Sequence, residues 1–183
     1  MAITISGSGI TSANIADGTI VNGDIHPSAA ISGSKLTGAG KVLQVVQGTT
    51  DTETINTTTT YADTTLTATI TRLSATSKIL VIITQGIWLE RSGGEAMQAW
   101  INLMRAGSQI NQRFYEIEAG LNNEVDRALA VTHAEHFLDT PTTTSVTYKT
   151  QARVGPTSAS PQVASQKGGT NYHSKITLME IGA

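Results

Sequence analysis

The chain has 183 residues, no cysteine, a formal net charge of -2 and only 14% charged residues. This length is sufficient for one domain of ordinary size plus an extension. The charge provides no polycationic surface for nucleic acid or anionic lipid, and the absence of cysteine excludes disulfides and thiol chemistry. The longest apolar run, 79–83, is far too short to cross a membrane, and the first residues do not resemble a signal peptide. We therefore expect no nucleic-acid partner and no membrane insertion.

The first forty residues follow a five-residue repeat of single aliphatic side chains separated by Gly, Ser, Thr, Asn and Asp. The repeating positions are Ile5, Ile10, Ile15, Ile20 and Ile25, followed after a one-residue slip by Ile31 and Leu36. A period of five is neither helical nor that of a strand, and the intervening residues favour turns. One buried side chain per repeat cannot form a core. We predict an extended arm over 1–40 whose aliphatic residues serve attachment and trimerisation. A flexible linker is the alternative.

From residue 41 the pattern becomes that of β-strands bounded by turn residues. The predicted strands cover 42–47, 65–71, 78–88, 97–104, 113–118, 124–138, 145–154 and 172–181. The segment 78–88 is apolar on both faces, which predicts a central strand buried on each side. The segment 124–138 also fits an amphipathic helix, but its neighbours favour a strand. About eight strands without intervening helices predict an all-β domain over 41–183, a jelly-roll-like antiparallel β-sandwich.

Two histidines, His133 and His136, form the one cluster of candidate metal ligands. On a helix they would share a face, whereas on a strand a spacing of three places them on opposite faces and prevents chelation. The pair also lacks the spacing of the HExxH motif. We therefore predict no metal, no cofactor and no catalytic residue.

The remaining candidates are carboxylates and aromatic residues. Glu116 and Glu118 resemble a carboxylate pair, but we expect them to be solvated or to pair with arginines such as Arg105 or Arg113. Four aromatic residues are candidate stacking platforms for sugars or bases: Trp88, Trp100, Phe114 and Tyr115. Because aromatic residues make up only 4% of the chain, we expect the core or contacts between chains to use them.

Several segments resemble bacteriophage tail-fibre and virion surface proteins. The arm segment IADGTIVNGDIHPSAAISGSKL at 15–36 is similar to one common in that family. The body resembles the β-sandwich modules that follow it there, through GKVLQVVQ (40–47), YADTTLTATIT (61–71), SKILVIIT (77–84), FLDTPTTTSVTYKTQAR (137–153) and SKITLMEIG (174–182). These motifs are turns and strands, so the resemblance indicates fold and setting better than activity. It implies a homotrimer and no catalytic residues.

Two non-enzymatic functions remain open. In the first, the protein is a short tail fibre on a virion, and loops 91–95, 107–112, 118–125 and 155–169 contact the host, with a surface glycan as the expected ligand. In the second, it is a capsid decoration protein whose residues 1–36 lie on the capsid. Fibres usually carry a docking domain before the repeat, whereas here the repeat begins near Met1, which keeps the second hypothesis open. A carbohydrate-active enzyme would need a carboxylate pair at a defined separation, and the sequence indicates none.

Overall fold

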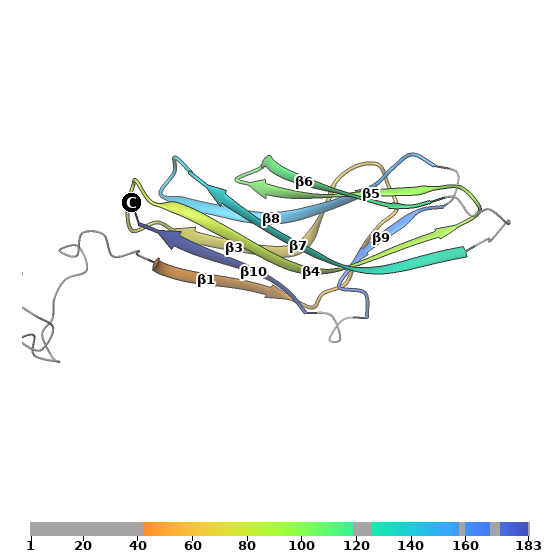
Figure 1. Cartoon of the computed structure of the whole chain (residues 1–183), viewed down its shortest axis with the longest axis horizontal. Helices are drawn as coiled ribbons and strands as arrows, with labels where there is room; N and C mark the ends of the chain where they lie inside the picture. The colour runs from red at the N-terminus through yellow and green to blue at the C-terminus, as the bar shows by residue number, and fades with distance from the viewer. Residues whose placement is uncertain (1–41, 119–125, 158–159, 169–172, 183) are drawn as a thin grey trace, which may run out of the picture. The chain divides into compact units, whose positions relative to one another are not determined.

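A computed structural model describes residues 42–118, 126–157, 160–168 and 173–182, all within the unit Gly40–Ala183. These residues form ten β-strands arranged as two antiparallel sheets that pack face to face (Figure 1). The predicted all-β sandwich is thereby confirmed. The described residues contain no helix that could cross a membrane.

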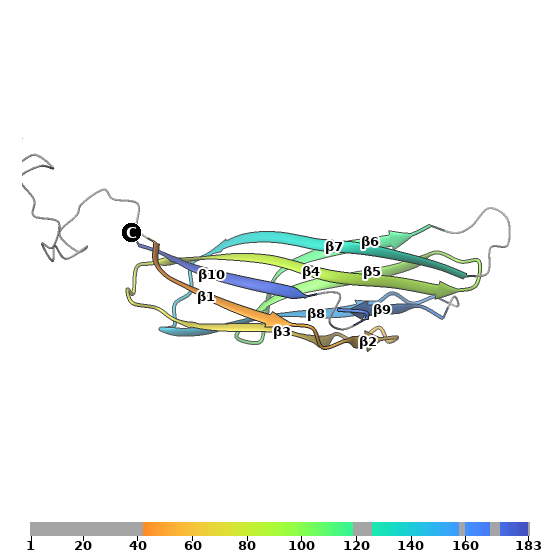
Figure 2. The same cartoon turned by 90° about the horizontal axis from the view of Figure 1, so that it is seen from below.

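The six-stranded sheet, called sheet A, contains the longest strands. Its members are β1 (Val42–Thr50), β2 (Thr54–Asn56), β4 (Lys78–Ser92), β7 (Asp126–Asp139), β9 (Gln162–Ser165) and β10 (Ser174–Ile181). The four-stranded sheet, called sheet B, completes the sandwich (Figure 2). Its members are β3 (Ala62–Thr71), β5 (Met97–Arg105), β6 (Ser108–Ile117) and β8 (Ser145–Val154).

The strands pair as one long hairpin in which each pair encloses the next. β5 pairs with β6, β4 with β7, β3 with β8, β2 with β9, and β1 with β10, all antiparallel. Rolling up this hairpin brings β10 and β9 against β4, and β8 against β5. The resulting orders, β1–β10–β4–β7 and β3–β8–β5–β6, are the topology of a jelly roll. At one edge, Gly48 in β1 lets the two sheets approach, because a Cβ there would lie 2.0 Å from the carbonyl oxygen of Thr67.

The structure adds two short strands that the sequence did not predict. β2 lies within the threonine-rich region 49–71, and β9 lies within the segment 155–169, which was predicted as a loop. Strand β6 also begins at Ser108, five residues before the predicted start at 113. These segments are held by pairing with β4, β5 or each other, and such tertiary pairing leaves no periodic pattern in the chain.

The prediction that β4 is buried on both faces is wrong. The strand is central, with β10 and β9 on one side and β7 on the other. Its side chains nevertheless alternate, because Ile79, Val81 and Ile83 are buried between the sheets while Ile82 is 38% exposed on the outer face. The outer face of this central strand is therefore partly aliphatic.

The core between the sheets consists of two apolar clusters. The first contains Leu66, Ala68, Ile70, Ile79, Val81, Ile83, Leu103, Val146, Tyr148, Ile176 and Leu178. The second contains Ile87, Leu89, Met97, Ala99, Ile101, Ile117, Ala152, Val154 and Val163.

Buried polar side chains lie along the chain between these clusters. Gln85 Nε2 donates to Thr64 Oγ1 at 2.8 Å, and the hydroxyls of Thr64 and Thr150 are 2.5 Å apart. Gln166 and Ser174 share a further hydrogen bond of 2.8 Å. These bonds satisfy polar groups that would otherwise destabilise the core, and they restrict the two sheets to one register.

Candidate functional site

The predicted attachment residues cannot be placed in this structure. Ile5, Ile10, Ile15, Ile20, Ile25, Ile31 and Leu36 lie outside the described residues. The same holds for 119–125 in the predicted contact loop 118–125. Of the two other predicted loops, 107–112 belongs mostly to β6, and 155–169 contains the short strand β9. The loop 91–95 begins two residues later than predicted, because β4 continues to Ser92.

The two histidines point to opposite faces of β7, as a strand requires. His133 is fully buried between the sheets, and His136 is exposed on the outer face of sheet A. The predicted strand 124–138 is therefore confirmed from residue 126 onward, and residues 124 and 125 lie outside the described residues. Within the described ranges, no three His, Cys, Asp or Glu side chains are grouped as metal ligands.

His133 belongs to a buried chain of polar side chains instead. Its Nδ1 lies 2.8 Å from the Tyr115 hydroxyl, and its Nε2 lies 3.2 Å from Glu135 Oε2. Asn111 donates to the other oxygen of Glu135. Burial raises the pKa of Tyr115, so the phenol keeps its proton. The positive charge of Arg113 acts to lower this pKa, and the negative charge of Glu135 acts to raise it. The two ring nitrogens of His133 therefore face a phenol on one side and a carboxylate on the other. This arrangement orients side chains between β6 and β7 and is structural.

Glu116 and Glu118, the candidate carboxylate pair, are both solvent-exposed. Glu116 is exposed and accepts a hydrogen bond from Gln98 at 3.2 Å, and Glu118, after the end of β6, is also exposed. Solvation of both was one of the two expectations. The proposed pairing with Arg105 is wrong, because Arg105 binds Asp139 at 2.6 Å.

The aromatic residues were expected to pack in the core or in contacts between chains, and the structure contradicts core packing for most of them, whereas contacts between chains stay a prediction. Trp88 and Trp100 are only half-buried on outward-facing strand positions, and Phe114 is 48% exposed. Only Tyr115 points inward, toward His133. The core is instead filled with aliphatic side chains and Tyr148.

The outer face of sheet B carries a line of aromatic and cationic side chains, here called the aromatic row: Phe114, Trp100, Arg153 and Tyr61. In register, Trp100 on β5 lies between Phe114 on β6 and Arg153 on β8. The rings of Phe114 and Trp100 have centroids 5.2 Å apart. The Arg153 guanidinium lies over both Trp100, at 4.0 Å, and Tyr61, at 5.1 Å. These contacts hold the guanidinium between two rings by cation–π attraction.

A second line of polar side chains runs beside the aromatic row, here called the amide row: Gln112, Asn102, Gln151 and Asp63. Gln112 Nε2 donates to Asn102 Oδ1 at 3.0 Å and also to the Tyr61 hydroxyl, which joins the two rows. Asp63 accepts from Gln151 at 2.8 Å and from Lys149 at 2.7 Å. Burial acts to raise the pKa of Asp63, but these hydrogen bonds and the Lys149 charge lower it below its ordinary value. The carboxylate is therefore a fixed negative charge.

Two hollows flank these rows. One, of about 170 Å³, is lined by Asp63, Thr65, Leu66, Thr67, Lys149 and Thr150. It lies where β3 is irregular opposite β8, and Thr65 there has a φ of 64°, a conformation that side chains other than glycine rarely adopt. The other, of about 390 Å³, is lined by Glu95, Ala96, Gln98, Pro156 and Thr157. Irregular strands of this kind are frequent beside functional sites.

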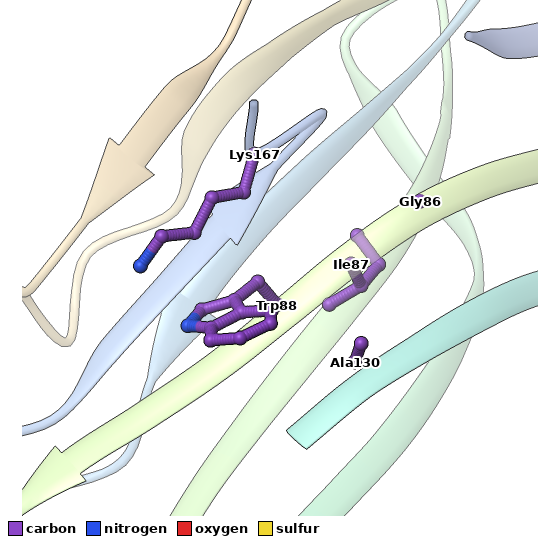
Figure 3. Close-up of a pocket in the computed structure, with 5 residues that line it drawn as sticks. All are labelled: Gly86, Ile87, Trp88, Ala130 and Lys167. Atoms are coloured by element: carbon purple, nitrogen blue, oxygen red, sulfur yellow. The ribbon is translucent and has the colours of Figure 1, made fainter. Parts of the chain in front are cut away.

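Trp88 forms a separate and smaller feature on sheet A (Figure 3). Lys167 Nζ lies 4.7 Å from the centroid of its ring, and both Lys167 and the indole N–H bind Glu90 Oε2, at 2.8 and 3.1 Å. The adjacent pocket, lined also by Gly86, Ile87 and Ala130, measures about 10 Å³, roughly the space of one water molecule. The face of the Trp88 ring is therefore already covered by Lys167 of the same chain.

The outer face of sheet A carries apolar side chains, here called the aliphatic patch: Val45, Ile82 and Leu138, which are exposed, and Leu80 and Met179, which are half-buried. Four of them are aligned across β1, β10, β4 and β7 by the register Val45–Met179, Met179–Leu80 and Leu80–Leu138. Val45 and Leu138, at the two edges of this line, are 56% and 53% exposed. A contiguous apolar surface of this kind is typical of a contact with another macromolecule.

Comparison with known proteins gives little. No family model and no curated protein matches the chain. Among solved structures, one of infectious bursal disease virus, Gt strain, has 14% identity and a TM-score of 0.26, and covers 75% of this chain and 40% of that chain. The VP2 subviral particle of the same virus has 13% identity and a TM-score of 0.25, and covers 76% and 38%. The chain thus spans about two fifths of these structures. TM-scores this low support no inference about function.

The two outer faces therefore define the candidate site, and both present side chains suited to binding. Sheet A presents the aliphatic patch, and sheet B presents the aromatic and amide rows. Arg153, Tyr61 and the amides were missed in the sequence because they stand at outward positions of separate strands. The signal available was the alternation in 97–104 and 145–154. It identifies outward residues but not which of them become neighbours across strands.

Proposed function

We propose that this protein is a non-enzymatic structural component of a virion, a homotrimeric short tail fibre or fibre-like module that contacts the host surface. The observation that carries the proposal is the aliphatic patch. It occupies the face of sheet A that includes β1, and β1 follows directly after the repetitive arm. An arm that cannot form its own core and a domain with an apolar outer face both require partner chains.

A second and third copy of the chain are the partners that suit this patch. Its side chains are aliphatic and carry no charge, as in the cores of homo-oligomer interfaces. Each Å² of apolar surface removed from water contributes about 25 cal/mol. Closed symmetry would bury the same patch on every copy, which leaves none exposed to cause aggregation.

The arm is proposed to hold the trimer on the particle. Its sequence supports this role, since seven aliphatic residues recur between turn-forming residues and the segment 15–36 resembles tail-fibre sequences. Residues 1–36 would grip another virion protein, of the tail or of the capsid, through these side chains.

Antibody labelling of intact particles tests the proposal directly. Gold particles bound to the tail are the expected result. Gold distributed over the capsid would replace the fibre with the alternative, a decoration protein whose arm lies on the capsid. Purified particles that contain none of the chain by mass spectrometry would overturn both.

A further inference from the structure

The guanidinium of Arg153 is held in place but is not neutralised. Trp100 and Tyr61 fix it from two sides at 4.0 and 5.1 Å, and its Nη1 donates to the Val154 carbonyl at 3.4 Å, which is long for a hydrogen bond. Among the described residues it has no carboxylate partner, whereas Lys149 binds Asp63 at 2.7 Å. A planar guanidinium with unused N–H groups is the preferred protein partner of a carboxylate, which it binds through two parallel hydrogen bonds.

Phe114 offers an open apolar face beside this cation. It is 48% exposed, although it lies on a strand and contacts the Trp100 ring. Aromatic rings in this position provide a flat, apolar surface on which the C–H face of a sugar ring can pack. Because Trp100 lies between Phe114 and Arg153, a ligand that covers Phe114 can reach the guanidinium with a charged substituent.

The amide row supplies groups that suit hydroxyls. Gln112 is exposed, and Gln151 is half-buried with its Nε2 bound to Asp63. Amide side chains both donate and accept, which matches hydroxyl groups better than it matches an apolar or purely anionic partner. The hollow lined by Asp63 and Lys149 and the hollow lined by Gln98 offer space for further sugar units.

We propose that the outer face of sheet B binds a saccharide that carries a carboxylate, with its ring on Phe114, its carboxylate at Arg153 and its hydroxyls at Gln112 and Gln151. This inference extends the proposed function, because it identifies the chemical class of host-surface ligand and moves the contact from the loops to a sheet face.

Nuclear magnetic resonance titration of the full chain tests it, with oligogalacturonate and oligosialate as the acidic probes. Carboxyl-reduced oligogalacturonate is the matched neutral probe. We expect at least one acidic probe to shift the Trp100 indole N–H and Arg153 side-chain signals at millimolar concentration, with binding at least tenfold weaker for a neutral probe. Absence of shifts with both acidic probes, or equal binding of the reduced form, would overturn the proposal.

Matched variants assign the contacts. Phe114→Ala and Arg153→Gln should each weaken binding at least tenfold, and Arg153→Lys should restore little of it, because an ammonium does not stack or bind a carboxylate with two parallel bonds. Leu73→Ala and Lys175→Gln, which alter an exposed leucine and an exposed lysine elsewhere, should leave binding unchanged. Melting curves check that each variant is folded. Folded Phe114 and Arg153 variants that bind as well as the parent would contradict the site.

The experiment separates this inference from the proposed function. Titration uses the purified chain, whereas the location on particles is measured by labelling. If the protein is detected on the virion but binds no acidic saccharide, only the proposed saccharide site is wrong. If it binds the saccharide but is absent from particles, only the proposed virion role is wrong. Capture of a host protein in a manner that depends on Phe114, without saccharide binding, would reassign the face to a protein partner and also overturn the proposal.

Discussion

At the scale of single residues, burial rather than residue type decides what a side chain does. His133 and His136 are three positions apart on β7, yet the first is fully buried against Tyr115 and Glu135 and the second is exposed. The strand period of two causes this difference, and it also prevents the pair from binding one ion.

The two histidines provide a matched pair of substitutions. His133→Ala should lower the free energy of unfolding by about 2–4 kcal/mol, because it leaves a cavity and unpairs Tyr115 and Glu135. His136→Ala should change it by less than about 0.5 kcal/mol, as for most exposed positions. Urea denaturation with and without EDTA measures both values. A free energy of unfolding that depends on EDTA would contradict the structural role of His133 and support a metal site.

The sequence could place these histidines but not the aromatic residues. Opposite faces for His133 and His136 follow from spacing alone once the strand is recognised. The outward position of Phe114 and Trp100 follows from the same alternation, but low aromatic content favoured the core or contacts between chains in our prediction. Aliphatic residues turned out to fill the core, so composition was the weaker guide.

At the scale of elements, one carboxylate joins three segments at an end of the sandwich. Glu180 near the end of β10 is fully buried. It accepts from Gln44 of β1 at 2.6 Å, from the Ser77 hydroxyl at 2.6 Å, and from the backbone N–H groups of Leu73 and Ser74 at 2.9 and 3.0 Å. It therefore fixes the turn between β3 and β4 to the β1–β10 pair. Burial of the carboxyl acts to raise its pKa, but these four donors outweigh burial and lower the pKa from 4.5 to about 2.

Glu180→Gln should reveal how much the Glu180 carboxylate contributes to the free energy of unfolding at each pH. Because the folded pKa lies below the ordinary value, the stabilisation is fully present above about pH 4.5 and is lost as the pH falls toward 2. A shift of this size corresponds to about 3 kcal/mol of unfolding free energy at pH 7. Urea denaturation of parent and variant between pH 7 and 2 should show curves that converge at low pH. The exposed Glu116→Gln is the control and should track the parent throughout, and a Glu180 deficit that stays constant down to pH 2 would contradict the assignment.

Strand prediction succeeded where apolar and polar residues alternate, and it failed where a segment becomes a strand only through pairing with other strands. β3, β8 and β10 alternate apolar and polar residues and were located within a few residues. β2 and β9 have three and four residues and are strands because they pair with each other and with β4. No local pattern specifies such a partner, so the fold class could be predicted while the nested pairing could not.

At the scale of the whole molecule, the two faces of the sandwich are chemically different. Sheet A presents the aliphatic patch, and sheet B presents the aromatic and amide rows. If copies of the chain associate through sheet A, every copy keeps sheet B exposed to a ligand. Threefold repetition would then present three equal sites, and linked sites bind a repetitive surface far more tightly than one site does.

The trimer can be tested at the edge of the aliphatic patch. Leu138→Asp places a charge at the β7 edge of the patch, beside Leu80, and burying that charge in an interface is costly. We expect light scattering after size exclusion to give a trimer for the parent and a monomer for this variant. Because Leu138 is already 53% exposed, the variant should remain folded, as its circular dichroism spectrum will show.

Thr132→Asp is the matched control, since it places the same charge on the same outer face of β7 at a position opposite Gly86, outside the patch. This variant should remain trimeric. A parent that is monomeric would remove the homotrimer. A parent trimer that survives Leu138→Asp would instead locate the contacts between copies away from sheet A. Dissociation by Leu138→Asp alone, with the saccharide shifts retained in each monomer, would establish that assembly and ligand binding use opposite faces of one sandwich.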